Sequence, residues 1–251
     1  MSYETYQFLI YVWIAAGVAT FILLQKVTAP YGRHTTSGWG PQINNNLGWI
    51  IMEAPVMILS LYFYLSSIEN QTAVSSFLMA TFVLHYINRT FIFPFRLRTK
   101  GKKMPLVIVG SAIFFNLVNG CSLGYYFAHF AVLDNSHFLK WYFILGSLLF
   151  IGGVYINWKS DNILIHLRKP GETGYAIPNG FLFNYLSCPN LFGEIIEWVG
   201  FALMCWNLPA VSFLVWSCAN LIPRAQSHHK WYLQKFANYP ANRKAIFPFL
   251  I

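Results

Sequence analysis

The sequence predicts an all-α, multi-pass integral membrane protein, and three observations support this fold class. Hydrophobic residues make up 56% of the 251 positions and charged residues only 10%, whereas a soluble domain carries about 25% charged residues. The apolar runs are too long and too numerous for the buried helices of a soluble core. Short polar segments rich in Gly, Pro, Asn and Lys separate these runs, and no stretch has the composition of a soluble domain. We therefore expect one membrane domain over residues 1–251.

Seven membrane spans are expected, because about 20 apolar residues cross a bilayer as a helix. The expected spans are 7–25, 47–67, 73–96, 105–132, 138–157, 191–207 and 209–223. The start, MSYETYQFLIYVWIAAGVATFILLQK, has no basic region ahead of its apolar run, which favours a first membrane helix over a cleaved signal peptide. The last two spans are expected to form a tight helical hairpin around Asn207-Leu208-Pro209. Asn119-Gly120 interrupts the fourth span, where we expect a kink or a break that lines a cavity.

The distribution of basic residues predicts the orientation of these spans. Fifteen Lys and Arg residues follow spans one, three, five and seven, whereas the opposite side holds only Lys140, and Arg89 lies within a span. By the positive-inside rule, the N-terminus is outside and the C-terminus is cytoplasmic. The net charge of +9 then reflects this topology and anionic lipid. Alternatively, some of the cations hold an anionic ligand on the cytoplasmic side.

Several ionisable side chains fall inside the apolar runs, where a charge costs about 2.5–3.5 kcal/mol on insertion scales. They are Glu53 in WIIMEAPVMI, Arg89 in LHYINRTF, and Glu194 and Glu197 in GEIIEWVGFALMCW. Glu194 and Glu197 are three residues apart and so share one helical face. Lone Asn or Tyr residues in such runs are usually satisfied by a neighbour, but intramembrane ionisable groups usually face a functional cavity. We expect one polar cavity that opens to the cytoplasm.

The motifs exclude several chemistries for this cavity. No Glu-x-x-His, His-x-x-x-His or His-Glu-x-x-His pattern is present, and the four cysteines have no C-x-x-C spacing, so no metal site is expected. A serine-hydrolase elbow, a dinucleotide-binding glycine motif and a Walker loop are also missing from the sequence. Transport stays open, although no inverted repeat is visible. The basic clusters around Lys100–Lys103 and Arg168-Lys169 favour an anionic, phosphate-bearing cofactor.

Six segments, in this order, resemble the steroid 5α-reductase family, the 3-oxo-5α-steroid 4-dehydrogenases. They are APYGRHTTSGWGP, MEAP, LHYINRTF, NGCSLGYYF, INWKSDNILIHLRKPGETGYAIPNGFLFNYLSCPNLFGEIIEWVGFAL and RAQSHHKWYL with the following YPANRKAIFPFLI. The resemblance covers residues 28–251, while the first span matches only in character. It implies a seven-helix membrane reductase with substrate-side helices in 1–132 and a cofactor-binding part in 133–251.

The resemblance also implies a reaction, in which NADPH reduces the C4–C5 double bond of a 3-oxo-Δ4-steroid by hydride transfer to C5. Negative charge develops on the steroid ketone, and the family's pair that hydrogen-bonds this ketone corresponds to Glu53 and Tyr86. Donors placed in advance in a dry site stabilise such an oxygen best. Glu53 must be neutral to donate, and low-dielectric surroundings favour the neutral carboxyl.

The family's cofactor residues are carried over to matching positions of this sequence. They correspond to Asn157, Asp161, Arg168, Tyr175, Asn190, Glu194, Trp198, Arg224, His228 and Tyr232, with Arg89 and Lys102 on matching basic positions. Glu197 is either a further site residue or a structural partner for a cation such as Arg224. Asn190, Glu194 and Trp198 follow one another by one helical turn, so we expect them to face the cofactor together.

Two departures from the family pattern affect this assignment. The segment PFRLRTKGKKMP is longer by about two residues than in the animal enzymes, and Lys102 stands where the family has Arg, which keeps the charge but loses the bidentate fork. The segment QSHHKWY contains fewer histidines than the corresponding family segment, so the assignment of His228 depends on how the two segments are aligned.

The expected partners are a lipophilic steroid that enters from the bilayer and membrane lipid, with neither nucleic acid nor a protein partner. The membrane is the endoplasmic reticulum in a eukaryote or the inner membrane in a bacterium. The alternatives are a reductase of sterol, polyprenol or enoyl-CoA double bonds, or a non-enzymatic seven-helix lipid transporter. Glu53 with Tyr86 favours the 3-ketosteroid branch, because the other substrates need no ketone clamp there.

Overall fold

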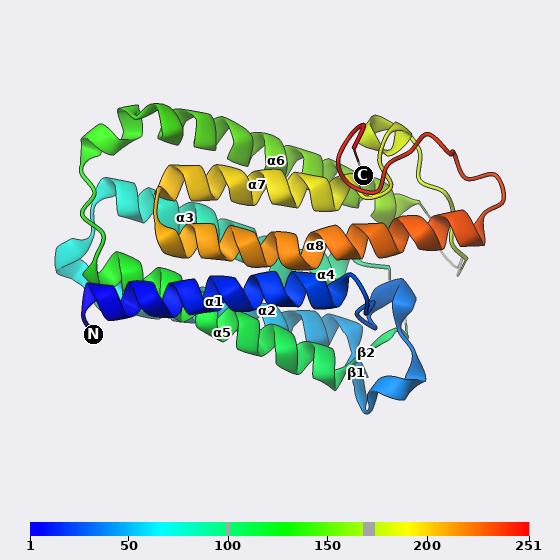
Figure 1. Cartoon of the computed structure of the whole chain (residues 1–251), viewed down its shortest axis with the longest axis horizontal. Helices are drawn as coiled ribbons and strands as arrows, with labels where there is room; N and C mark the ends of the chain where they lie inside the picture. Colours follow the sequence, from blue (N-terminus) through cyan, green and yellow to red (C-terminus); the bar gives the residue numbers. More distant parts are fainter. Residues whose placement is uncertain (99–100, 168–173, 251) are drawn as a thin grey trace. The chain divides into compact units, whose positions relative to one another are not determined.

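The computed structural model describes residues 1–98, 101–167 and 174–250, and this part of the chain is mostly helical (Figure 1). The α-helices are α1 (Tyr3–Leu24), α2 (Asn45–Leu65), α3 (Ala73–Ile87), α4 (Phe93–Arg96), α5 (Leu106–His129), α6 (Trp141–His166), α7 (Pro189–Cys205) and α8 (Leu208–Lys235). A π-helix, η4 (Asn88–Ile92), joins α3 to α4. Short 3₁₀ turns are η1 (Gly32–His34), η2 (Ser37–Trp39), η3 (Ile68–Asn70), η5 (Asn135–Leu139) and η6 (Phe181–Asn184).

Helix starts in the first half of the chain follow local capping chemistry. The Asn44 side chain accepts hydrogen bonds from the backbone N–H groups of Asn46 and Leu47 and so caps α2. Thr72 and Ser75 form a reciprocal capping box at the start of α3. The polar residues that separate the apolar runs therefore determine where the next helix begins.

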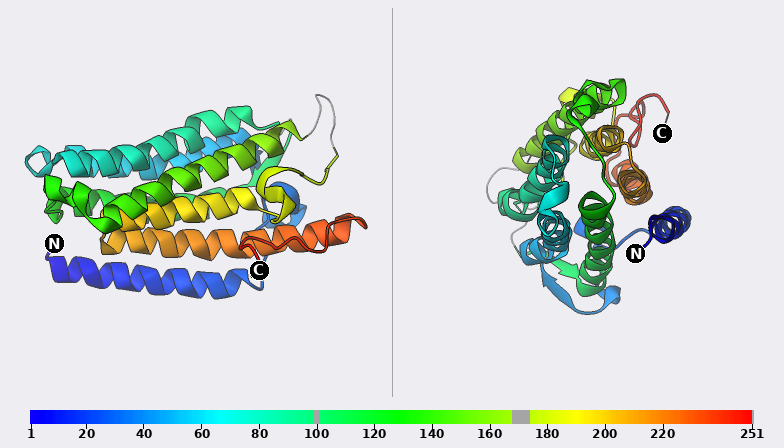
Figure 2. Two further views of the ribbon diagram at one scale, coloured as in Figure 1. Left: turned by 90° about the horizontal axis from the view of Figure 1, so that it is seen from above. Right: turned by 90° about the vertical axis from the view of Figure 1, so that its left-hand side faces the viewer.

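Each expected span overlaps helical structure, and four of these helices are long and apolar enough to cross a bilayer. Among the described residues these four are α1, α2, α5 and α6. The helical class is thus confirmed, and the tight hairpin is confirmed as well, because α7 ends at Cys205 and α8 begins at Leu208. Figure 2 shows α7 and α8 side by side and antiparallel. Helix α8 continues past the expected end of the last span and carries Pro223 in its interior.

The expected break at Asn119-Gly120 is wrong, because α5 runs without interruption from Leu106 to His129. Gly120 instead allows two helices to touch. A Cβ atom at Gly120 would lie 2.8 Å from the carbonyl oxygen of Val56 in α2, and one at Gly124 would lie 2.8 Å from the carbonyl oxygen of Ser60. Small residues one turn apart bring membrane helices into backbone contact. The glycine therefore allows close helix packing.

A two-stranded antiparallel sheet was not expected from the sequence. Strand β1 (Gln42–Asn44) pairs with β2 (Lys103–Pro105), with Ile43 opposite Met104. The sheet ends directly before α2 and α5, and the backbone N–H of Asn45 donates to the carbonyl of Lys102 at 3.1 Å. The paired strands therefore tie the starts of α2 and α5 together.

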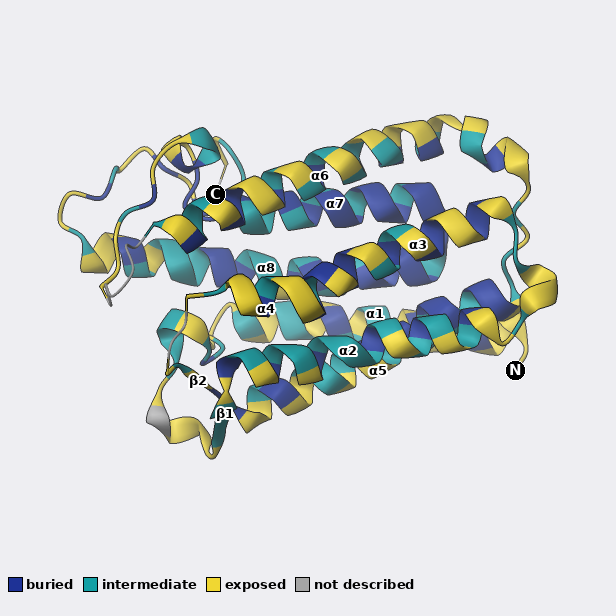
Figure 3. Ribbon diagram, turned by 180° about the vertical axis from the view of Figure 1, so that it is seen from behind, coloured by how far each residue is buried: buried dark blue, intermediate teal, exposed yellow. Residues whose placement is uncertain are grey.

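The chain forms two compact units. Unit 1 comprises Met1–Val12, Ala29–Ile144 and Met204–Val211, and unit 2 comprises Trp13–Thr28, Leu145–Leu203 and Ser212–Ile251. Unit 1 is built mainly on α2, α3 and α5, and unit 2 on most of α6, α7 and α8. Figure 3 shows many exposed residues, in yellow, along α3 and α6, whereas α7 and α8 are mostly buried or intermediate. The exposed residues of α2, α3, α5 and α6 include many large apolar side chains. Such surfaces are suited to contact with lipid.

Candidate active site

Glu53 lies near the middle of α2 in unit 1 and is half-buried. Pro55, two residues later, lacks the N–H group that would bond to the carbonyl of Ile51, so the helix is weakened next to the glutamate. Asn116 of α5 approaches this turn: its Nδ2 donates to the carbonyl oxygen of Met52 and to Oε2 of Glu53, the latter at 3.4 Å. The sequence prediction did not include Asn116, since one asparagine in an apolar run carries no distinctive signal.

Tyr86 lies one residue before the end of α3 and is buried, with 4% of its surface exposed. Its ring centroid lies 4.9 Å from that of Phe82 and 5.1 Å from that of His85. Helix α2 packs against α3 and η4 within unit 1. Glu53 and Tyr86 therefore occupy neighbouring helices of one unit, and their pairing on a substrate ketone stays a prediction.

Arg89 lies in η4, where the helix widens to a π turn. Its guanidinium carbon is 5.1 Å from the ring centroid of Trp49 and 4.6 Å from that of Phe93. Trp49 precedes Glu53 by four residues on α2, so both are on one helical face. The cation–π contacts bring the charge of Arg89 to the same side of α2 as Glu53. π turns of this kind often occur at functional sites.

A hydrogen-bonded chain of polar side chains joins α6 to α7 in unit 2. Asn157 Nδ2 donates to the carbonyl of Asn190 at 3.0 Å, and Asn190 Nδ2 donates to Oδ1 of Asp161 at 3.0 Å. Asn157 and Asp161 are buried, with 1% and 6% of their surfaces exposed. The structure thus brings together three of the predicted cofactor residues, which we call the α6–α7 polar network.

Three glycines let α6 and α7 approach closely enough to form this network. A Cβ at Gly153 would lie 2.3 Å from the backbone nitrogen of Glu197, one at Gly193 2.5 Å from that of Asn157, and one at Gly200 2.3 Å from that of Phe150. Real Cβ atoms do not come this close to another backbone. Backbone contact between α6 and α7 is therefore a condition for the Asn157–Asn190 bond.

Helix α7 also carries Glu194, Glu197 and Trp198. Glu197 is buried with 1% exposure, and its backbone lies against Gly153 of α6. Glu194 is only half-buried. Trp198 is buried, and its ring packs edge-on against Phe213 of α8 with a centroid distance of 4.5 Å. The two glutamates thus differ in environment although they are three residues apart: Glu197 is on the side of α7 that faces α6.

The predicted residues of α8 are spaced by about one turn along a single helix. Arg224 and Tyr232 are buried, with 7% and 2% exposure, and His228 lies between them. Tyr175 packs edge-on against Trp231 with a centroid distance of 4.9 Å, which places the 174–179 segment beside α8. Arg168 lies outside the described residues.

A second polar cluster in unit 2 was missed by the sequence prediction. Ser187, just before α7, is bonded through Oγ to Nδ1 of His229 at 2.6 Å and to the hydroxyl of Tyr239 at 2.7 Å. Burial, with the charge of Lys244, lowers the pKa of His229. Burial raises the pKa of Tyr239, against the opposing effects of Ser187 and Arg243. Both shifts favour a neutral cluster, which we call the Ser187 hub.

Backbone hydrogen bonds fasten the C-terminal tail to the same place. Ser187 N–H donates to the carbonyl of Lys244 at 2.8 Å, and Lys244 N–H donates to that of Tyr185 at 2.9 Å. Buried Arg243 donates to the carbonyl of Pro178 at 2.8 Å and to Oδ1 of Asn179 at 2.7 Å. The tail therefore supports the segment that leads into Asn190.

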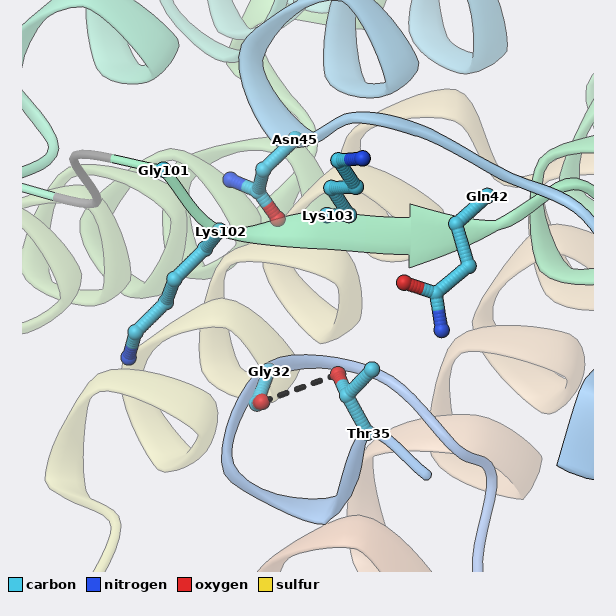
Figure 4. A pocket seen from close by; sticks show the side chains of 7 residues that line it. All are labelled: Gly32, Thr35, Gln42, Asn45, Gly101, Lys102 and Lys103. Carbon is cyan, nitrogen blue, oxygen red and sulfur yellow. Dashed lines mark hydrogen bonds between the residues drawn. The ribbon is translucent and has the colours of Figure 1, made fainter. Parts of the chain in front are cut away.

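Lys102 lies at a polar cavity of about 260 Å³ in unit 1. The lining residues are Gly32, Thr35, Gln42, Asn45, Gly101, Lys102 and Lys103. Figure 4 shows that the ammonium groups of Lys102 and of Lys103, the first residue of β2, point in different directions. Thr35 closes the loop opposite through a hydrogen bond from Oγ1 to the carbonyl of Gly32 at 3.0 Å. An anionic group entering this cavity would meet two cations and several amide groups.

Comparison with known proteins places the chain in a family. The profile of the family described as 3-oxo-5-alpha-steroid 4-dehydrogenase matches residues 102–251. Steroid 5-alpha-reductase DET2 of Arabidopsis thaliana is 39% identical over 244 residues, covering 94% of this chain and 93% of that protein. The 3-oxo-5-alpha-steroid 4-dehydrogenase 1 of Homo sapiens is 40% identical over 244 residues, covering 96% and 94%. On both grounds, the chain belongs to the 3-oxo-5-alpha-steroid 4-dehydrogenase family, the steroid 5-alpha-reductases.

Proposed function

We propose that this protein is a membrane oxidoreductase that uses NADPH to reduce the C4–C5 double bond of a 3-oxo-Δ4-steroid to the 5α-dihydro product. The observation that carries the proposal is a carboxyl group, Glu53, at mid-depth of an apolar helix, in a chain about 39% identical to steroid 5-alpha-reductases along nearly its whole length. Placing a carboxyl group in an apolar membrane helix costs free energy, which indicates that the group has a function.

Glu53 and Tyr86 supply the donors that this reaction needs. Negative charge builds up on the ketone oxygen as the double bond is reduced, and hydrogen bonds to that oxygen are stronger in the transition state than in the bound substrate. In apolar surroundings the neutral carboxyl is favoured, so Glu53 can donate its O–H, and the Tyr86 hydroxyl supplies a second donor. The polarised ketone makes C5 more electrophilic, and a proton is then delivered at C4.

The residues of unit 2 fit a nicotinamide dinucleotide. When bound, NADPH supplies the hydride that is transferred to C5. The α6–α7 polar network offers amide and carboxylate groups for ribose hydroxyls or the carboxamide, in the way that buried polar groups fix the orientation of a cofactor. Glu194, Trp198, Arg224, His228, Tyr232 and Tyr175 complete the proposed set on this side, with Arg168 in the segment outside the described residues.

Cations hold the phosphates in this proposal. Lys102 in its polar cavity and Arg89 in η4 are the described candidates, and a positive site of this kind accounts for NADPH in preference to NADH. A lysine at 102 binds a phosphate as a point charge, without the two parallel hydrogen bonds that an arginine makes.

We further propose that the chain crosses the membrane seven times, with the N-terminus outside and the C-terminus cytoplasmic. The four long apolar helices account for four crossings, and α3 with η4 and α4, α7, and the first part of α8 account for the others. The basic residues then lie on the cytoplasmic side, where NADPH is present, and the steroid enters from the bilayer. The membrane is the endoplasmic reticulum or a bacterial inner membrane.

The test is steroid-dependent NADPH oxidation by purified protein in detergent. Progesterone or testosterone is added, and the product is identified by mass spectrometry. A 5α-dihydrosteroid formed in step with NADPH consumption supports reaction, cofactor and substrate class together. NADPH binding without steroid reduction would indicate that the substrate is another enone or a sterol. Failure to bind NADPH would overturn the enzyme assignment.

A further inference from the structure

We propose that Asn116 is a positioning residue for Glu53: its amide determines which oxygen of the carboxyl carries the proton that is directed to the substrate ketone. This inference rests on the proposed function. It concerns a residue of α5 that neither the sequence patterns nor the family motifs single out.

The orientation of the Asn116 amide follows from its contacts. Its side chain is buried, with 2% exposure, and Nδ2 lies within hydrogen-bonding distance of the carbonyl oxygen of Met52. A backbone carbonyl only accepts hydrogen bonds, so the nitrogen and not the oxygen of the amide must face it. The second hydrogen on Nδ2 is then the one that reaches Oε2 of Glu53 at 3.4 Å.

This contact distinguishes the two oxygens of a neutral carboxyl group. One oxygen of that group carries the hydrogen, and the other only accepts. The hydroxyl oxygen of a neutral carboxyl is the weaker acceptor of the two, so the N–H of Asn116 favours the arrangement in which Oε2 accepts and Oε1 carries the acidic hydrogen. Glu53 then presents a donor of fixed direction before substrate binds, which is the preorganisation that transition-state stabilisation requires.

The α2–α5 packing keeps the amide at this place. Gly120 and Gly124 hold the α5 backbone against α2 one and two turns beyond Asn116, so α5 cannot slide along α2 without a clash. Pro55 disturbs the bonding of the α2 turn in which Met52 and Glu53 lie, so this turn gains from a partner on another helix.

A purely structural asparagine would not be arranged in this way. Within the described residues no group donates to Oδ1 of Asn116, although the atom is buried. A buried oxygen without a partner costs stability, and an apolar side chain of the same size would avoid that cost. The amide thus acts only as a donor, to the backbone at Met52 and to the carboxyl of Glu53.

The kinetic test compares Asn116→Leu with Ser122→Ala, which removes a side-chain bond to the Val118 carbonyl on the same helix. We expect Asn116→Leu to lower kcat about tenfold, the effect of one lost hydrogen bond in the transition state, with NADPH affinity and steroid KM nearly unchanged. Ser122→Ala should leave kcat within about twofold. In a Glu53→Gln background the effect of Asn116→Leu should disappear, because contacting residues are coupled. An equal loss in both backgrounds would overturn the positioning role.

A spectroscopic test works without turnover and so separates this inference from the proposed function. Infrared difference spectra against Glu53→Gln identify the C=O band of the neutral Glu53 carboxyl. Loss of a hydrogen bond accepted by that oxygen moves the band to higher wavenumber in Asn116→Leu, or in Asn116→Ala if the leucine variant does not fold. If the band moves but no steroid is reduced, the positioning role of Asn116 is supported and the proposed substrate is wrong. An unmoved band, or no neutral carboxyl band, would overturn the positioning.

Discussion

The polar groups of the two units are held in different ways. In unit 2, Asn157, Asn190 and Asp161 are joined by bonds of 3.0 Å, and the Ser187 hub has bonds of 2.6 and 2.7 Å. In unit 1, Asn116 reaches the Glu53 carboxyl across 3.4 Å. A rigid polar frame suits a large polar cofactor that makes many hydrogen bonds. The amide of Asn116 orients the Glu53 carboxyl, and catalytic hydrogen bonds often shorten only when substrate binds.

If Glu53 of unit 1 acts on the substrate and the α6–α7 polar network of unit 2 acts on the cofactor, Glu53→Gln should affect catalysis without affecting cofactor binding. We expect kcat for steroid reduction to fall about 10²- to 10³-fold, the loss typical of one preorganised donor, because an amide N–H is a far weaker acid than a carboxyl O–H. NADPH affinity, measured by quenching of protein fluorescence, should stay within about twofold because Glu53 lies outside the α6–α7 polar network. Loss of NADPH binding in this variant would contradict the assignment of Glu53 to the substrate alone.

The rigidity of unit 2 is tested by Gly153→Ala, with Gly152→Ala as the matched control. The new Cβ at 153 would lie 2.3 Å from Glu197 N and 2.6 Å from its Cα, so α6 and α7 must separate and the Asn157–Asn190 bond lengthens. We expect a loss of about 1–3 kcal/mol or more in stability, with weaker NADPH binding. A Cβ at Gly152 meets nothing within 4 Å. Equal thermal unfolding temperatures for the two variants would show that close contact between α6 and α7 at Gly153 does not determine the stability.

The Ser187 hub predicts a pH dependence of stability that unit 1 should not share. The pKa of His229 is lowered below its ordinary value of 6.5 by burial and by Lys244, so the unfolded chain binds this proton more readily than the folded one. The hub's contribution is therefore complete above pH 6.5 and is lost as the pH falls from there toward the lowered pKa. Its surroundings include Tyr239 and Arg243.

Thermal unfolding between pH 7.5 and about 5 measures this contribution. His229→Asn places an amide oxygen near the position of Nδ1, so it keeps an acceptor for the Ser187 hydroxyl and removes the titrating group. We expect the variant to lose less stability on acidification than the native chain. Ser187→Ala should lower the unfolding temperature at neutral pH instead. A steeper acid loss in His229→Asn would contradict the neutral hub.

The smallest effect is expected for Lys102→Ala. Partly exposed ion pairs contribute about 0–1 kcal/mol, so NADPH affinity should weaken by no more than about fivefold, and the difference should shrink at high salt. Lys140→Ala is the control, since Lys140 is exposed and does not line the cavity. Titration with NADPH and NADH at low salt distinguishes a phosphate contact from a general charge effect. An equal change in the affinities for NADPH and NADH would show that Lys102 does not contact the 2′-phosphate.

Within the α6–α8 part, local spacing was sufficient to predict much of the arrangement. Asn190, Glu194 and Trp198 lie on α7, as their one-turn spacing indicated. Helical periodicity connects residues a few positions apart, so a single sequence reveals it. The side-chain bonds of the α6–α7 polar network and the Ser187 hub connect residues 29 to 52 positions apart, and no periodic signal marks them.

The sequence by itself determined the class of the protein and the places of its helices, because long apolar runs must satisfy their backbone groups as helices in lipid. It also pointed to Glu53, since an intramembrane carboxyl is costly. Only the tertiary structure decided that Asn116, 63 residues away, donates to that carboxyl. It also decided that Gly120 packs a helix rather than breaking it, whereas Gly110 meets nothing within 4 Å. Such roles depend on which neighbouring backbone lies against a residue, and that contact exists only after the helices have packed.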